Sequence, residues 1–299
     1  MKPTDNTPGS VSIVIPAKNE AESLGKLLPA VNALSCDEVI VVDDGSTDGS
    51  AEVATANGAK VIRHPYSIGN GGAIKSGARA ARGEILVFMD ADSQHDPSDI
   101  ERLLSRLQDD YDMVVGARDR GSQANSGRAV ANRFYNWFAS RIVGQSVLDL
   151  TSGFRVARRA RFREFLLMLP NGFSYPTTIT MCFFRAGYRV GYVPITAQPR
   201  IGKSHIRLVR DGVRFLLIIF RVGALYSPLK VFVPSAAAVF LAGLARYVYT
   251  YVTFGRFTNM SALLLSTAVV IFLLGLVSEQ ITMLTYQNAN SSENDTHDE

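Results

Sequence analysis

Two long apolar segments near the end of the chain restrict its fold more than any other feature of the sequence. Residues 231–245 carry no charged side chain and run into Arg246 among tyrosines, and residues 260–278 carry no charge at all. A helix needs about 20 predominantly apolar residues to cross a bilayer, and an arginine near one end of a span can reach the interface. With only residues 254–259 between them, the segments predict an antiparallel transmembrane hairpin. The alternative is a buried helical hairpin in a soluble protein.

Basic residues are concentrated before the first apolar segment. They are Arg200, Lys203, Arg207, Arg210, Arg214, Arg221 and Lys230, whereas only Arg256 lies in the linker. Cytoplasmic flanks of membrane spans carry the excess of Lys and Arg, so we expect the N-terminal domain in the cytoplasm and the linker outside. Four of these arginines share one face of a helix predicted over residues 206–226. This pattern predicts a helix lying at the membrane surface, or alternatively an amphipathic helix packed on the domain.

The first two-thirds of the chain alternate between predicted strands and helices. Apolar runs predict strands at 11–15, 38–42, 60–63, 85–89 and from 112 to 116, and helical spacing predicts helices at 21–34, 50–57, 74–81, 97–107 and 130–142. This alternation predicts an α/β sheet with helices on both faces.

These patterns divide the chain into five parts. They are a polar N-terminal tail (1–10), an α/β domain (11–204), membrane-surface helices (205–228), a transmembrane hairpin (229–287) and a disordered acidic tail (288–299).

Composition restricts the class of protein further. The chain has 299 residues and a formal net charge of +4. We expect no nucleic-acid partner. Cys36 and Cys182 are far apart and lack metal-type spacing, which predicts two reduced thiols in a cytoplasmic domain. The first ten residues are polar and show no signal peptide.

Two acidic clusters follow predicted strands. Asp43 and Asp44 follow the second strand, and Asp90, Asp92 and Gln94 follow the fourth. Ligands of open α/β sheets bind at the carboxyl ends of strands. Carboxylates placed together need a cation or hydrogen-bond donors, and their hard oxygens suit Mg²⁺ or Mn²⁺, which would hold the diphosphate of a nucleotide. An Asp-x-Asp pair alone is weak evidence, because such pairs are common on solvated turns. The prediction of a metal site depends on the position of this pair after an apolar strand and on the second acidic cluster.

Six motifs in order resemble glycosyltransferase family 2. They are Ile15-Pro16-Ala17-Lys18-Asn19-Glu20, Asp43-Asp44-Gly45-Ser46-Thr47-Asp48, Gly69-Asn70-Gly71-Gly72-Ala73, Asp90-Ala91-Asp92-Ser93-Gln94-His95, Thr151-Ser152-Gly153-Phe154-Arg155 and Arg200-Ile201-Gly202-Lys203-Ser204. The last two look like the dolichol-phosphate mannose synthase branch, the polyprenyl-phosphate glycosyltransferases. The resemblance covers nearly the whole chain. It implies a GT-A fold, related to a Rossmann sheet, and inverting transfer of a hexose from a GDP- or UDP-sugar to a polyprenyl phosphate such as undecaprenyl or dolichyl phosphate.

The resemblance also implies a nucleotide site. Pro16 and Glu20 should line the nucleoside pocket, Asp43 should recognise the base or ribose, and Asp44 should support that pocket. The family often has an aromatic residue where Lys18 stands, so the resemblance implies no stacking role there. Gly71, in the glycine-rich segment, should let the backbone pass close to the nucleotide.

By the same resemblance Asp90, Asp92 and Gln94 form the metal group for Mg²⁺ or Mn²⁺, with Asp92 also counted as catalytic. A lipid phosphate and a leaving diphosphate both need cations and donors. The candidates by motif position are Arg118, Arg133, Ser152, Arg155, Arg200 and Lys203.

The acceptor affects what catalysis requires. A phosphate monoester has a second pKa of about 6, so its oxygen is already a nucleophile near neutral pH. We therefore expect no dedicated general base, with positioning and charge stabilisation supplying most of the rate. A two-helix anchor is compatible with self-association.

Three other functions remain as alternatives. A processive polysaccharide synthase usually carries a Q-x-x-R-W motif, which Trp137, the single tryptophan, does not complete. A hydrolase or nucleotidyltransferase could use the same metal site. A non-catalytic lipid-binding or scaffold protein would not need the acidic and basic motifs.

Overall fold

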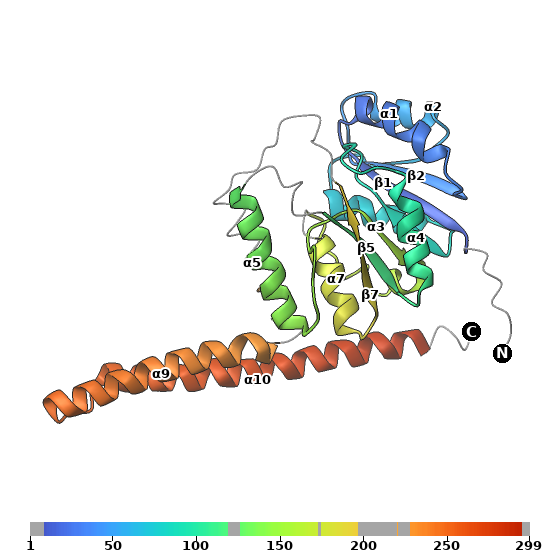
Figure 1. Ribbon diagram of the computed structural model, residues 1–299. Coiled ribbons are helices and arrows are strands. Elements are labelled where there is room, and N and C mark those ends of the chain that lie inside the picture. Colours follow the sequence, from blue (N-terminus) through green and yellow to red (C-terminus); the bar gives the residue numbers. More distant parts are fainter. Residues whose placement is uncertain (1–8, 119–125, 173–174, 197–219, 221–227, 295–299) are drawn as a thin grey trace. The chain divides into compact units, whose positions relative to one another are not determined.

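The structure is a computed structural model that describes residues 9–118, 126–172, 175–196, 220 and 228–294 (Figure 1). Arg200, Lys203 and almost all of the predicted membrane-surface helix lie outside these residues. The chain forms two compact units, an α/β unit and a unit built on two long helices.

The elements that precede the two long helices follow the predicted order and extend it. In chain order they are β1 (Val11–Ala17), α1 (Ala21–Asn32), β2 (Glu38–Asp43), α2 (Ser50–Ala56), β3 (Lys60–Arg63), α3 (Asn70–Ala80), β4 (Ile85–Phe88), α4 (Asp99–Gln108), β5 (Met113–Arg118), α5 (Ser126–Val143), β6 (Arg155–Arg158), α6 (Arg159–Arg163), α7 (Tyr175–Arg185) and β7 (Val190–Ile195).

The strands form one mixed sheet in the order β3-β2-β1-β4-β6-β5-β7. Strand β6 runs antiparallel to β4 and β5, and the other neighbouring pairs are parallel. Because β6 is reversed, the residues just before it lie at the same edge as the carboxyl ends of β1, β2, β4 and β5. The predicted α/β sheet is confirmed, and this single reversal brings the Thr151–Arg155 motif to the edge where ligands bind.

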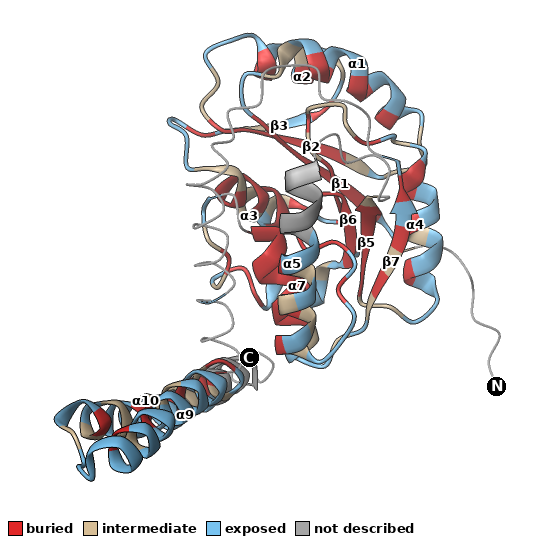
Figure 2. Cartoon of the chain, turned by 60° about the vertical axis from the view of Figure 1, so that its left-hand side comes forward, coloured by how far each residue is buried: buried red, intermediate tan, exposed pale blue. Residues whose placement is uncertain are grey.

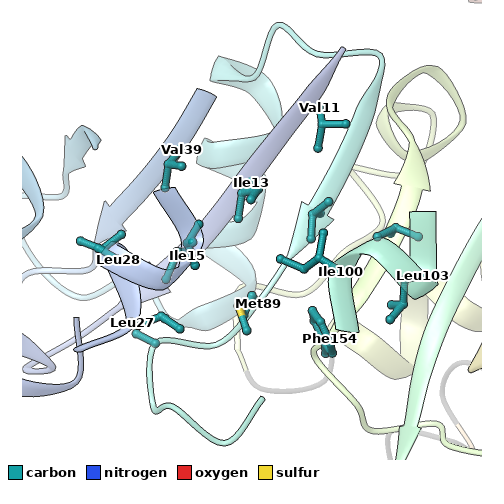
Figure 3. Packing of buried hydrophobic residues seen from close by; sticks show 14 of the residues in the cluster. Val11, Ile13, Ile15, Leu27, Leu28, Val39, Met89, Ile100, Leu103 and Phe154 are labelled. Atoms are coloured by element: carbon teal, nitrogen blue, oxygen red, sulfur yellow. The ribbon is translucent and has the colours of Figure 1, made fainter. Parts of the chain in front are cut away.

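Each face of the sheet is covered by helices. On one face, Ile13 and Ile15 of β1 pack with Leu28 of α1 and with Ile100 and Leu103 of α4 in a continuous apolar core (Figure 3). These helices bury apolar residues at the three- and four-residue spacing of an amphipathic helix. Burial in the α/β unit is concentrated on the strands and on parts of the helices (Figure 2).

Helices α3 and α6 cover the other face. A Cβ added at Gly77 of α3 would lie 2.3 Å from Cγ1 of Val14 and 3.3 Å from Cγ2 of Val42, so α3 packs closely on β1 and β2. Phe162 of α6 packs on Phe88 of β4, with ring centroids 4.5 Å apart. The result is a three-layer α/β sandwich, as the alternating pattern predicts.

The second unit consists of α9 (Pro228–Phe254) and α10 (Asn259–Asn294). Both are long and apolar enough to cross a membrane, with mean hydropathies of 1.7 and 2.5. Their side chains are mostly exposed (Figure 2), as expected for helices that face lipid rather than a protein core. Gly243 and Gly275 allow close contact between them, because an added Cβ would lie 3.0 Å from Leu264 and 2.6 Å from Phe232.

The structure differs from the prediction by several residues at three helix boundaries, one of which is the start of α5 at Ser126 rather than at residue 130. Helix α3 begins at Asn70 rather than at residue 74, so the glycine-rich segment forms its first turn. Helix α10 continues to Asn294, seven residues beyond the predicted end of the hairpin at residue 287. Helical hydrogen bonds propagate beyond the apolar segment even where the sequence becomes polar.

Candidate active site

The candidate active site lies along the edge of the sheet that the carboxyl ends of β1, β2, β4 and β5 share with the start of β6. Asp43 ends β2, the Asp90–Gln94 turn follows β4, and Arg118 ends β5. The Thr151–Gly153 turn precedes β6 and therefore lies opposite the turn after β4. The structure thus brings the acidic motifs and the Thr151–Arg155 motif together.

The turn after β4 is tightly shaped. The backbone N–H of Gln94 donates to Oδ1 of Asp92 at 3.2 Å, and Ser93 between them has a positive φ of 56°. The Asp90 carboxylate packs on Gly153, where an added Cβ would lie 2.5 Å from Oδ2. A glycine therefore leaves room for one carboxylate of the predicted metal group.

The donor set fits a hard divalent cation whose ligand shell the protein fills only partly. Among the described residues, no three His, Cys, Asp or Glu side chains gather as a ligand set. The candidate group instead combines the carboxylates of Asp90 and Asp92 with the amide of Gln94. Mg²⁺ characteristically takes one or two carboxylates and completes its shell with water and substrate phosphate oxygens, so this smaller set suits a cation that arrives with a nucleotide.

His95 lies just behind this turn. It is buried, and its ring stacks on Phe154 with centroids 4.9 Å apart. Burial lowers the pKa of His95 to about 4; Asp92 works against this lowering, and Arg118 adds to it. The imidazole is therefore neutral at pH 7. Its packing on Phe154 places it beneath the turn.

Arg118 is held by Asp149 in a two-bonded ion pair. Its Nε donates to Oδ2 at 2.8 Å and its Nη2 to Oδ1 at 3.0 Å, and Nη2 also donates to Oγ1 of Thr151. Burial works to lower the pKa of Arg118, but Asp149, Asp90 and Asp92 outweigh it and raise that pKa. The predicted phosphate contact by Arg118 must therefore come from a guanidinium that already neutralises one carboxylate. Asp149 was not predicted, although it stands only two residues before the Thr151 motif.

Arg155 does not occupy the position that its predicted role requires. Its side chain is fully buried, with Nη1 donating to the carbonyl oxygen of Pro176 at 3.1 Å and to Oγ1 of Thr180 at 3.2 Å, and Nη2 donating to the carbonyl oxygen of Ser152. Strand β6 directs the guanidinium into the protein against α7, so the predicted contact of Arg155 with a lipid phosphate requires this side chain to move. Ser152 itself is buried, and its hydroxyl finds no hydrogen-bond partner among the described residues.

Asp44 and Asp43 have different surroundings at the end of β2. Asp44 is buried and accepts hydrogen bonds from His64, Ser67, Ile68 and Gly69 at 2.7–2.8 Å. Burial works to raise the pKa of Asp44, but these hydrogen bonds lower it to about 2. Its carboxylate therefore holds the loop after β3 in place.

Asp43 is buried more completely than its predicted nucleotide contact suggests. Its Oδ1 accepts the N–H of Ser46 at 2.9 Å, and its Oδ2 lies 3.2 Å from Nε of Arg63. The Asp43 side chain has no exposed surface, whereas that of Arg63 is 55% exposed. A base or ribose contact by Asp43 therefore requires the Arg63 side chain to move aside.

The first motif places Pro16 within β1, opposite Val42. Glu20 lies just before α1, where its Oε2 accepts a hydrogen bond from Ser23 and its N–H donates to Oγ of Ser50. Both residues lie at the end of β1 nearest the Asp43–Asp44 turn, as the predicted nucleoside pocket requires.

The glycine-rich segment packs against the protein's own backbone. A Cβ at Gly71 would lie 2.0 Å from the carbonyl oxygen of Pro170, and the N–H of Gly72 donates to the carbonyl oxygen of Asn171 at 3.0 Å. Lys75 also donates to the carbonyl oxygen of Leu169 at 3.1 Å. The group that approaches Gly71 in this structure is the 169–172 segment, so the predicted approach of a nucleotide requires that segment to move.

The remaining basic candidates are less constrained. Arg133 is exposed on α5, so its guanidinium is accessible. Arg200 and Lys203 lie outside the described residues.

Solved structures share this fold. Glucosyl-3-phosphoglycerate synthase from Mycobacterium tuberculosis, solved with Mn²⁺, UDP-glucose and phosphoglyceric acid, superposes with a TM-score of 0.61 at 21% identity, over 72% of this chain and 80% of that one. A second structure of that synthase, with Mn²⁺, UDP and glucosyl-3-phosphoglycerate, gives a TM-score of 0.58 at 24% identity over 71% and 80%. The likeness shows a GT-A-type fold.

Sequence comparison identifies the protein family. The pattern of glycosyl transferase family 2 matches residues 12–167, and that of the GtrB C-terminal hairpin matches residues 227–284. Glycosyltransferase AglJ of Haloferax volcanii is 31% identical over 81% of this chain and 82% of its own length. The chain belongs to glycosyltransferase family 2.

A further relative has a name that states its acceptor. Undecaprenyl-phosphate 4-deoxy-4-formamido-L-arabinose transferase of Yersinia enterocolitica is 37% identical over 50% of this chain and 49% of its own length. The chain thus spans about half the length of that relative.

Proposed function

We propose that this glycosyltransferase moves a hexose from a GDP- or UDP-sugar to a polyprenyl phosphate at the cytoplasmic face of a membrane, with inversion at the anomeric carbon. One observation carries the proposal. The Asp90–Gln94 turn meets the Thr151–Gly153 turn at one sheet edge in a chain that also carries two membrane-length helices. The Yersinia relative named for undecaprenyl phosphate supports the choice of acceptor.

The donor's diphosphate binds with Mg²⁺ or Mn²⁺ in this proposal. Asp90, Asp92 and Gln94 hold the cation, which offsets the charge of the leaving nucleotide. Mn²⁺ bound with UDP-glucose in the mycobacterial synthase supports a divalent ion. Pro16 and Glu20 line the nucleoside pocket at the end of β1.

In this proposal, basic and hydroxyl side chains bind the acceptor phosphate. Arg118, Arg133 and Ser152 are the described candidates, and Arg200 and Lys203 come from outside the described residues. A phosphate oxygen that is already ionised needs no general base, so these residues contribute by orienting it and by stabilising charge.

Transfer of label into lipid tests the proposal. Membranes containing the protein are given a panel of radiolabelled UDP- and GDP-hexoses with polyprenyl phosphate and Mn²⁺ or Mg²⁺. We expect label from one donor to enter the organic phase and to remain in water when the metal is chelated. Release of free sugar without lipid-linked product would indicate a hydrolase instead, and no product from folded, nucleotide-binding protein would contradict the proposed acceptor.

Orientation across the membrane is a separate prediction. With Cys36 and Cys182 replaced by serine, a cysteine at Asn259 in the linker should react with a membrane-impermeant maleimide in intact cells. A cysteine at the exposed Lys18 of the α/β unit should react only after permeabilisation, because the basic flank keeps that unit in the cytoplasm. Labelling of Lys18→Cys in intact cells would reverse the orientation.

A further inference from the structure

We propose that Arg155 and Tyr175 are positioning residues, which hold the Ser152–Gly153 turn as a rigid platform that aims the Asp90 carboxylate at a divalent cation. This inference rests on the metal-dependent function proposed above and deepens it. It assigns a role to two fully buried polar side chains that touch neither the nucleotide pocket nor the exposed edge.

The platform contacts Asp90 through Gly153. An added Cβ at Gly153 would lie 2.5 Å from Oδ2 of Asp90, and 3.1 Å from both Oδ1 and Cγ. All three atoms belong to the carboxylate, so this group packs directly against the glycine with Oδ2 nearest. Since the φ angle of Gly153 is not positive, the glycine is required for space rather than for backbone conformation.

The register of the sheet explains why these two residues meet. Strands β4 and β6 are antiparallel, with Phe88 opposite Arg155. Extending this register by two residues places Asp90 opposite Gly153. Thus the position of the carboxylate depends on where the residues before β6 are held.

Two buried side chains hold the carbonyl groups of this turn. Nη2 of Arg155 donates to the carbonyl oxygen of Ser152, and the hydroxyl of Tyr175 donates to that of Gly153 at 3.2 Å. Both side chains have no exposed surface. Arg155 is in turn tied to Pro176 and Thr180 of α7, the helix that Tyr175 begins. Helix α7 therefore anchors both successive carbonyl groups.

The charge of Arg155 suits the same role. Among the described residues it forms no ion pair with a carboxylate, and its hydrogen bonds go to carbonyl and hydroxyl oxygens. A charged donor forms stronger hydrogen bonds than a neutral one, so the guanidinium holds the carbonyl oxygen of Ser152 firmly.

The platform can be tested by Mn²⁺ binding, apart from turnover. Free Mn²⁺ is measured by electron paramagnetic resonance during titration of the full-length protein in detergent, alone and with UDP or GDP. We expect Gly153→Ala to weaken Mn²⁺ binding by about tenfold to a hundredfold, the range found when groups supporting metal ligands are removed. Tyr175→Phe, which loses one hydroxyl, should weaken it about threefold to tenfold.

Gly191→Ala is the matched control. Its added Cβ would lie 3.1 Å from Cδ1 of Tyr111, so it adds the same methyl group in a tight place within β7 whose nearest atoms all belong to Tyr111. We expect it to lower the thermal midpoint without changing the dissociation constant for Mn²⁺. Tyr175→Phe keeps the inference testable if Gly153→Ala does not fold.

The outcomes separate this inference from the proposed function. Wild-type binding that is lost in Asp92→Ala but kept in folded Gly153→Ala and Tyr175→Phe would overturn the platform and leave the metal site standing. A wild-type protein with no affinity for Mn²⁺, with or without nucleotide, would overturn both. Equal weakening by Gly191→Ala would assign the effect to general packing and would overturn the platform.

Discussion

Replacing Asp92 with asparagine should slow sugar transfer to the lipid by about a hundredfold to a thousandfold, the range seen when one group that stabilises transition-state charge is removed. Asparagine keeps the shape of the side chain and can still accept the N–H of Gln94, which lies 3.2 Å from Oδ1. What it loses is the negative charge that a divalent cation requires. Initial rates of label transfer in membranes measure the effect, with the thermal midpoint showing that the fold is retained.

Asp96→Asn is the control for this change. Asp96 lies four residues further along the same segment, is exposed, and its Oδ1 accepts the N–H of Ser98. The chemical change is identical, so we expect a rate within about twofold of wild type, as for a surface substitution with little effect. If Asp92→Asn were as active as Asp96→Asn, the Asp90–Gln94 turn would not be the metal site.

Much of the fold could be predicted because its central strands are apolar runs buried on both faces. Residues 11–15 and 38–42 show this pattern, and both became parallel strands of the sheet. Strand β6 was not predicted, since its four residues begin and end with arginine. Arg155 is buried there only because α7, more than 20 residues later, supplies oxygen atoms for its guanidinium. Hydrogen bonds between residues this far apart cannot be inferred from the spacing of neighbouring residues in the sequence.

In the candidate site, too, some features could be predicted from the sequence and others could not. The acidic turns could be located because they follow apolar strands, a relation visible along the chain. The partners of these acids could not, because Gly153 reaches Asp90 across 63 positions through an antiparallel pairing. The glycine-rich segment was predicted to approach a nucleotide, and its contact with the 169–172 segment of the same chain could not be inferred from the sequence.

Removing the Asp44 carboxylate has the second-largest effect that we expect, and this effect is on the stability of the fold. Asp44→Ala should lower the free energy of unfolding of the α/β unit by about 3–5 kcal/mol, the range for removing one partner of a buried charged group. The substitution leaves buried donors from His64 and Ser67 and the N–H groups of Ile68 and Gly69 without their acceptor. Urea unfolding in detergent measures the change. Asp109→Ala, which removes an exposed partner of Arg106, should cost less than about 1 kcal/mol.

The pH dependence of stability gives an independent check on the same carboxylate. The pKa of Asp44 is about 2 in the folded protein against an ordinary value of 3.8, a difference of about 1.8 units that corresponds to about 2.4 kcal/mol. Because the folded pKa is the lower one, this stability is present above pH 4 and is lost as the pH falls from about 4 to 2. Wild type should therefore lose more stability over that window than Asp44→Asn, which has no proton to bind. Parallel curves for the two proteins would mean that other contacts, such as the packing of Tyr66 and Ser67 on Gly45, hold the loop after β3.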